Sequence, residues 1–103
     1  MEEKCAWKPE ERETIPLNGE MEALAEEISE EIHNAWARKR IADGWTWGLC
    51  RSDEKKETPC LVAYNRLPES EKAYDRAVAR CALQALLGRG YEIRKTEVAP
   101  ERK

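Results

Sequence analysis

The stretch that decides how this chain is interpreted runs from Ile32 to Gly48 and reads IHNAWARKRIADGWTWG. It contains the only histidine of the protein, three of its four tryptophans and the basic cluster Arg38–Arg40. Large aromatic side chains concentrated this tightly favour one of two structures. They form the centre around which a core closes, or they form a stacking surface for a flat ligand.

Composition places this stretch in a single small domain. The chain has 103 residues and a mass of 11.9 kDa, which is the size of one domain. Its net charge of -3 argues against general nucleic-acid binding, which usually requires a basic excess. Apolar runs are far shorter than the roughly 20 residues of a membrane span, and the first residues lack the layout of a signal peptide. We therefore expect a cytoplasmic protein that does not associate with membranes.

The four cysteines do not form a metal-binding pattern. Cys5, Cys50, Cys60 and Cys81 include no C-x-x-C pair, and only one histidine is available to assist them. Structural zinc sites require close ligand pairs, so we predict no metal and no other cofactor. Disulfides remain formally open, but reduced thiols are favoured because Cys81 falls on the apolar face of a predicted helix. Nothing local places a cysteine beside the histidine as a catalytic pair.

The residues before the quoted stretch predict an extended arm and an amphipathic helix. Residues 1–17 contain two prolines and no periodicity, and Trp7 is expected to anchor this arm on the domain. The helix begins near Asn18, a favourable N-cap, and ends before Gly44. Its apolar positions recur at helical spacing: Met21, Leu24, Ala25, Ile28, Ile32 and Ala35.

After Gly44 the sequence predicts short strands and a second helix. Residues 45–50 and 61–64 are expected to pair as an antiparallel hairpin across a charged loop, with Trp45 and Trp47 packed under the helices. The second helix starts near Pro68 and ends at Gly88, and residues 91–93 could add a last strand. Its main apolar stripe comprises Tyr74, Ala77, Val78, Cys81, Ala82 and Ala85, and it widens at Leu83, Leu86 and Leu87. We thus predict an α+β domain over 18–95, with a polar tail at 96–103.

Several motifs resemble those of a known family. The pattern IHNAWAxxRIADGWTWG is followed by PCLVAY at 59–64, LPE at 67–69, Glu71-Lys72, and LLGxGY at 86–91. In this order they resemble the ryanodine receptor repeat, or RyR domain, from about Pro9 to Ile93. Trp47 departs from the family, which often has tyrosine at this position.

The resemblance implies a fold of two main helices packed with short antiparallel strands. Giant calcium-release channels carry this unit as tandem pairs, whereas one copy and no channel-forming segment are present here. The resemblance therefore implies a single-copy, stand-alone member of the prokaryotic or phage type, and not calcium release. Single-copy members have been proposed to sense nucleotide-like ligands.

Helical spacing places His33, Trp36 and Arg40 along one border of the first helix, facing outward from the core. An indole stacks on planar rings, a guanidinium binds phosphate or carboxylate as a fork, and an imidazole bonds to the ring edge. We also include Lys56, which could close over a ligand from an otherwise solvated loop, and Tyr64, whose hydroxyl is left for a partner. Alternatively, Trp36 covers the rim of the core, His33 is a structural hydrogen-bonded group and Arg40 forms an ion pair.

Three functions follow from these alternatives. The first is a non-enzymatic binding or regulatory module for a nucleotide-like or other planar anionic ligand. The second is a protein-protein interaction module without a small ligand, acting on a partner protein or as a homodimer, since aromatic and arginine side chains dominate interface hot spots. The third, a small hydrolase or transferase using His33, has little support because no nucleophile elbow or phosphate loop is present. We expect no enzymatic activity.

Overall fold

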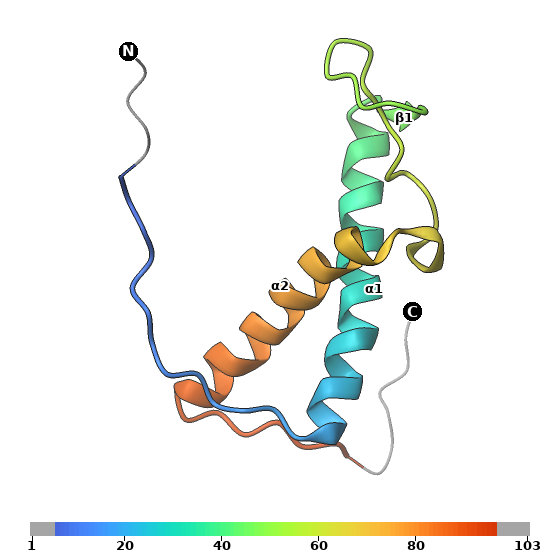
Figure 1. Ribbon diagram of the computed structural model, residues 1–103. Coiled ribbons are helices and arrows are strands. Elements are labelled where there is room, and N and C mark those ends of the chain that lie inside the picture. The colour runs from blue at the N-terminus through green and yellow to red at the C-terminus, as the bar shows by residue number, and fades with distance from the viewer. Residues whose placement is uncertain (1–5, 97–103) are drawn as a thin grey trace.

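A computed structural model describes residues 6–96 (Figure 1). It contains α1 (Gly19–Ala42), β1 (Thr46–Trp47), β2 (Glu57–Thr58), the 3-10 helix η1 (Tyr64–Arg66) and α2 (Glu69–Gly88). The protein therefore has the predicted α+β fold with two main helices. Cys5 and most of the predicted polar tail lie outside the described residues.

Helix α1 has the boundaries that its capping residues predict. The Asn18 side chain accepts a hydrogen bond of 2.9 Å from the backbone N–H of Met21, and acidic residues occupy the first turn. At the other end Gly44 adopts φ +92°, a conformation that glycine accommodates without strain. The chain then reverses, and the N–H of Trp45 donates to the carbonyl of Arg40 at 2.9 Å.

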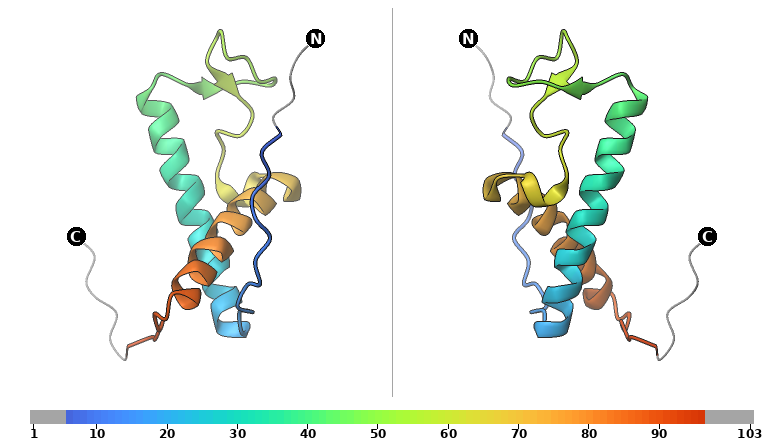
Figure 2. Two further views of the ribbon diagram at one scale, coloured as in Figure 1. Left: turned by 90° about the vertical axis from the view of Figure 1, so that its left-hand side faces the viewer. Right: turned by 90° about the vertical axis from the view of Figure 1, so that its right-hand side faces the viewer.

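The core lies where α2 crosses the lower half of α1, as Figures 1 and 2 show. Ala25 and Ser29 of α1 meet Ala79 and Leu83 of α2, and all four are almost fully buried. The Ser29 hydroxyl donates to the Ala25 carbonyl at 2.7 Å, which satisfies the buried polar group within its own helix. Partly buried apolar residues surround this crossing: Leu17, Leu24, Ile28, Ile32 and Ile93.

The predicted apolar stripe of α2 does not face the core. Tyr74 is 71% exposed, Val78 is 55% exposed, and Cys81 is exposed as well. Instead, α2 presents Arg76 and Arg80 beside its buried residues, and these arginines pair with glutamates of α1. The prediction for this face was wrong because long basic side chains occupy the edges of the helix interface, with their charged ends on α1 carboxylates.

Three ion pairs across or along this helix interface hold the arginine side chains of α2 in place. Arg76 Nε lies 2.6 Å from Glu26 and its Nη1 lies 2.8 Å from Glu69, while Arg80 bonds to Glu22. Tyr64 joins the cluster, because its hydroxyl donates to Glu26 at 3.0 Å. Arg76 holds the pKa of Glu26 below its usual value through these bonds.

The two strands pair in parallel, so the predicted antiparallel hairpin was wrong. Thr46 pairs with Glu57 and Trp47 with Thr58. Glu57 also forms an antiparallel bridge with Ser52, with two backbone bonds of 2.9 Å. The chain therefore reverses twice between β1 and β2, and the returning strand runs in the original direction. Lys56, at φ +54°, lies immediately before this returning strand.

The other predicted strands do not form. In the segment 59–63, the N–H of Cys60 donates to Thr58 Oγ1 and that of Val62 donates to the Cys60 carbonyl, so the chain folds on itself before η1. Figure 2 shows this segment descending from the strands to η1, facing the upper half of α1. Residues 91–93 form no strand.

Two tryptophans lie in unexpected places. Trp45 is 9% exposed and belongs to the interior as predicted, but Trp47 is 54% exposed because it lies on the open side of the short strand. Trp7 is 76% exposed and does not anchor the arm. The arm is held further along, where Leu17 packs on the core and the Ile15 carbonyl accepts from Gln84 at 3.2 Å.

Candidate functional site

The upper half of α1 extends beyond its crossing with α2 and borders a cleft of about 220 Å³. Helix α1 contributes His33, Trp36 and Arg40 to the lining, and α2 contributes Glu71, Tyr74 and Asp75. The segment between the helices completes it with Arg51, Thr58, Cys60 and Leu67. These ten residues define the Trp36 cleft. The structure thus gathers three of the predicted site residues in one place.

His33 is a buried structural group within this cleft and does not face outward as predicted. Its side chain is only 4% exposed, because positions 25, 29 and 33 continue one buried face of α1. Nε2 lies 2.6 Å from the Val62 carbonyl, which can only accept a hydrogen bond, so Nε2 carries a proton. Nδ1 points toward Asp75, whose carboxylate oxygen is 4.0 Å away.

Trp36 is half-buried, with His33 on one side. The two rings are stacked, with centroids 5.5 Å apart and planes 26° from parallel. The indole is neither sealed inside the core nor fully exposed. It can therefore offer the part of its surface that lines the cleft to a planar ligand.

Arg40 is held by aromatic rings. Its guanidinium carbon lies 4.6 Å from the Trp45 ring centroid and 5.8 Å from that of Trp36, both within cation–π range. Arg51 approaches Trp45 at 5.7 Å but is also bonded to Asp53, with Nε–Oδ1 at 2.8 Å. Within residues 6–96 no carboxylate lies within ion-pair distance of Arg40. The ion pair considered from the sequence does not form there, although Arg51 chiefly, and Arg40 to a smaller extent, hold the pKa of Asp53 below its usual value.

The opposite wall is acidic. Glu71 and Asp75 lie one turn apart on α2, and both are half-buried. Burial raises the pKa of Asp75. Burial and the neighbouring Glu71 also raise the pKa of the Cys60 thiol, which keeps it protonated and unreactive at neutral pH. Tyr74 lies at the rim, where most of its ring is exposed.

The remaining two predicted site residues lie outside the cleft lining. Lys56 donates through Nζ to the Asp43 carbonyl at 2.9 Å, so it fastens the loop to the end of α1. The Tyr64 hydroxyl points to Glu26 at the helix crossing, and burial with the bond to Glu26 raises its pKa. The Lys72 ammonium lies 5.4 Å from the Tyr64 ring. Neither residue therefore lines the Trp36 cleft, although the Tyr64 ring centroid lies 6.2 Å from that of His33.

The sequence patterns did not indicate the acidic wall or the place of Arg51 in the cleft. Glu71 and Asp75 have the i, i+4 spacing that places two side chains on one face of a helix, which is a usable signal. Nothing in the local sequence indicates that this face meets His33. For Arg51 no signal exists, because its position depends on the double reversal between the strands.

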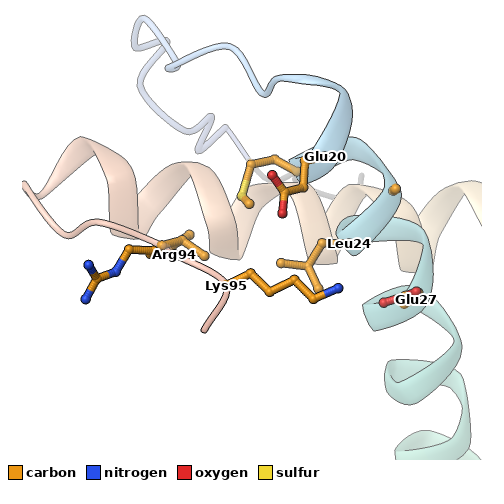
Figure 3. Close-up of a pocket in the computed structure, with 8 residues that line it drawn as sticks. Glu20, Leu24, Glu27, Arg94 and Lys95 are labelled. Atoms are coloured by element: carbon orange, nitrogen blue, oxygen red, sulfur yellow. The ribbon is translucent and has the colours of Figure 1, made fainter. Parts of the chain in front are cut away.

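A second hollow lies at the start of α1, where residues 93–95 pass beside it (Figure 3). Its volume is about 340 Å³, and its apolar lining includes Met21, Leu24 and Ile93. Figure 3 shows the Lys95 side chain extending toward Glu27 and the Arg94 side chain pointing away. No aromatic residue lines it. We interpret this hollow as a packing seam between α1 and residues 93–95, which follow α2.

The fold and the Trp36 cleft define the class of protein: a small two-helix α+β module with an aromatic, charged cleft. Comparison with known families matches residues 7–95 to the RyR domain. Because this match covers most of the 103 residues, the chain belongs to the RyR domain family. None of the helices formed by residues 6–96 combines the length and apolarity that a membrane span requires.

Proposed function

We propose that this protein is a non-enzymatic RyR-type binding module that takes a nucleotide-like or other planar anionic ligand in the Trp36 cleft. One observation carries the proposal: a half-buried indole and a guanidinium that forms no ion pair within residues 6–96 line the same cleft. The indole offers stacking, worth roughly 1–3 kcal/mol for a base, and Arg40 offers a fork for an anionic group.

The size of the cleft supports a weak or moderate site. Small-molecule pockets usually measure about 300–1,000 Å³. The Trp36 cleft is smaller, at about 220 Å³. It would therefore enclose one part of a nucleotide and leave the remainder against the exposed rim at Tyr74. Such a ligand would exchange readily, as a sensing role requires.

The arrangement of His33 supports the absence of catalysis. Cys60 and His33 line the same cleft, which makes a cysteine–histidine pair worth considering. However, Nε2 is bonded to the Val62 carbonyl and Nδ1 faces Asp75, so neither ring nitrogen is directed at the thiol. The raised pKa of Cys60 also opposes thiolate formation.

Isothermal titration calorimetry with a panel of ribonucleoside 5′-phosphates tests the proposal. We expect Trp36→Ala and Arg40→Gln each to weaken binding about tenfold or more, the cost of a lost base stack or charged hydrogen bond. Trp47→Ala is the matched control, because it removes an exposed tryptophan outside the cleft. Absence of heat with every nucleotide, or equal affinity in all variants, would overturn the proposal.

The alternative function, a protein-interaction module, is favoured by the outer face of α2. Tyr74 and Val78 lie about one turn apart on this helix and are both exposed, and exposed apolar surface of this kind can mark an interface. Sedimentation of the wild type and of Val78→Ser tests self-association, since Val78 lies outside the Trp36 cleft. Concentration-dependent sedimentation that Val78→Ser abolishes would support a homodimer, and an inert monomer would count against it.

A further inference from the structure

The Trp36 cleft has two walls of opposite charge. Arg40 and Arg51 line the side formed by α1 and the loop before β2, while Glu71 and Asp75 line the side formed by α2. A simple anion would interact favourably with the first wall and unfavourably with the second. The arrangement therefore favours a ligand that has an anionic group at one end and hydrogen-bond donors at the other.

At the basic wall, one guanidinium is available for an anionic group. Arg51 is already bonded to Asp53 at 2.8 Å, which satisfies part of its charge. Arg40 forms no ion pair within residues 6–96; its guanidinium carbon lies 4.6 Å from the Trp45 ring centroid and 5.8 Å from that of Trp36, and it contributes less than Arg51 to the lowered pKa of Asp53. A cation–π contact holds the guanidinium at the indoles and does not use its N–H donors, which can bind oxygen.

At the acidic wall, two carboxylates lack a cationic partner. Within residues 6–96, Glu71 forms no ion pair but accepts a hydrogen bond from the Cys60 thiol, and the Asp75 carboxylate lies 4.0 Å from Nδ1 of His33. Asp75 is mostly covered, with 19% of its side chain exposed. Carboxylates in a covered cleft are strong acceptors, and they favour a ligand that brings hydrogen-bond donors.

We propose that the Trp36 cleft selects a ligand carrying a vicinal diol as well as an anionic group, and that this ligand is a ribonucleotide. The inference rests on the proposed function and deepens it. The phosphate binds at Arg40, the ribose hydroxyls donate to Glu71 and Asp75, and the base lies against Trp36 at the open rim. A diol supplies two neighbouring donors to two carboxylates that lie one helical turn apart. The enclosed volume suits the sugar and phosphate, with the base outside.

Ligand analogues test the proposed recognition of a vicinal diol without any change in the protein. Adenosine 5′-monophosphate is compared by calorimetry with its 2′,3′-dideoxy form, which keeps the phosphate and the base. We expect the dideoxy form to bind at least about tenfold more weakly, the size expected when hydrogen bonds to a charged acceptor are lost. Ribose 5-phosphate distinguishes a sugar phosphate from a nucleotide. We expect it to bind about tenfold more weakly than the nucleotide because it lacks the stacked base.

A second experiment changes a residue of the acidic wall. Glu71→Gln should reduce the preference for the ribonucleotide over the dideoxy form to less than about threefold, because a neutral amide is a weaker acceptor. Glu30→Gln, an exposed position of α1 outside the cleft, is the matched control and should retain the full preference.

The outcomes separate the two proposals. Equal binding of the ribo and dideoxy forms, with loss of both in Arg40→Gln, would overturn the diol inference and leave the proposed function standing. Ribose 5-phosphate binding as tightly as the nucleotide would overturn the nucleotide assignment and assign the cleft to sugar phosphates. No binding of any of these compounds would overturn both proposals.

Discussion

Replacing His33 by leucine tests the most specific contact in the structure. The change keeps the buried bulk but removes the Nε2–H donor, so the Val62 carbonyl loses its partner at 2.6 Å. An acceptor left unpaired in a covered site costs about 1–3 kcal/mol. Loss of the ring stacked on Trp36 adds about 0.5–1.5 kcal/mol, partly offset by leucine packing. We expect the free energy of unfolding to fall by about 2 kcal/mol.

Urea denaturation and thermal unfolding measure this loss. For a domain of this size, about 2 kcal/mol corresponds to a fall in Tm of about 8 °C or more. His33→Gln is the control, because glutamine lacks the ring but retains an N–H donor at the same end, so its loss should be smaller. Imidazole ¹⁵N spectra supply an independent measurement: Nε2 of His33 should carry the proton that it donates to the Val62 carbonyl. A leucine variant as stable as the wild type, or an unprotonated Nε2, would refute the reasoning.

Three further predictions concern the helix interface and the strands. Glu26→Gln should destabilise the protein at neutral pH. Because folding lowers the pKa of Glu26, the loss of stability should be complete above pH 4.5, the ordinary pKa value, and should vanish as the pH falls through the lowered pKa of the folded state. Urea midpoints of both proteins measured across pH test this. Trp45→Ala should cost about 3–5 kcal/mol in urea unfolding, whereas Trp47→Ala should change stability by less than about 0.5 kcal/mol; equal losses would contradict their assigned burial. Gly48→Ala would place the new Cβ 2.6 Å from Glu57 Cβ and push the strands apart, which should lower the free energy of unfolding by about 1–3 kcal/mol. A Gly48→Ala variant with the thermal stability of the wild type would contradict this.

Local sequence was sufficient for the helices. Asn18 and Gly44 each act through a few neighbouring backbone groups, so their effect does not depend on distant parts of the chain. The start of α2 after Pro68 follows from the same kind of short-range rule. For this reason the structure confirms both helices close to their predicted boundaries.

The burial of α2 could not be predicted by the same rules. Hydrophobic periodicity assigns Tyr74 and Val78 to the core, yet the structure exposes them and buries Ala79 and Leu83. The deciding interactions are long-range: Arg76 pairs with Glu26, 50 positions earlier in the chain. Periodicity within one helix carries no information about which carboxylates another helix presents.

In the candidate site too, some features follow from the local sequence and others only from the tertiary structure. Helical spacing alone brings His33, Trp36 and Arg40 to one side of α1, because three and seven residues correspond to about one and two turns. Whether that side is open or covered depends on what packs against it. The segment 59–63 covers His33 through the Val62 carbonyl, and α2 brings Asp75 to its other nitrogen.

The sequence by itself determined the two helices, their caps and the aromatic and basic cluster of the RyR domain, since each depends on residues within a few turns of one another. Only the tertiary structure decided the parallel strand pair, the exposed face of α2 and the acidic wall of the Trp36 cleft. Those features depend on contacts between residues far apart in the chain. Their energies come from burial and charge pairing that exist only after the helices have crossed.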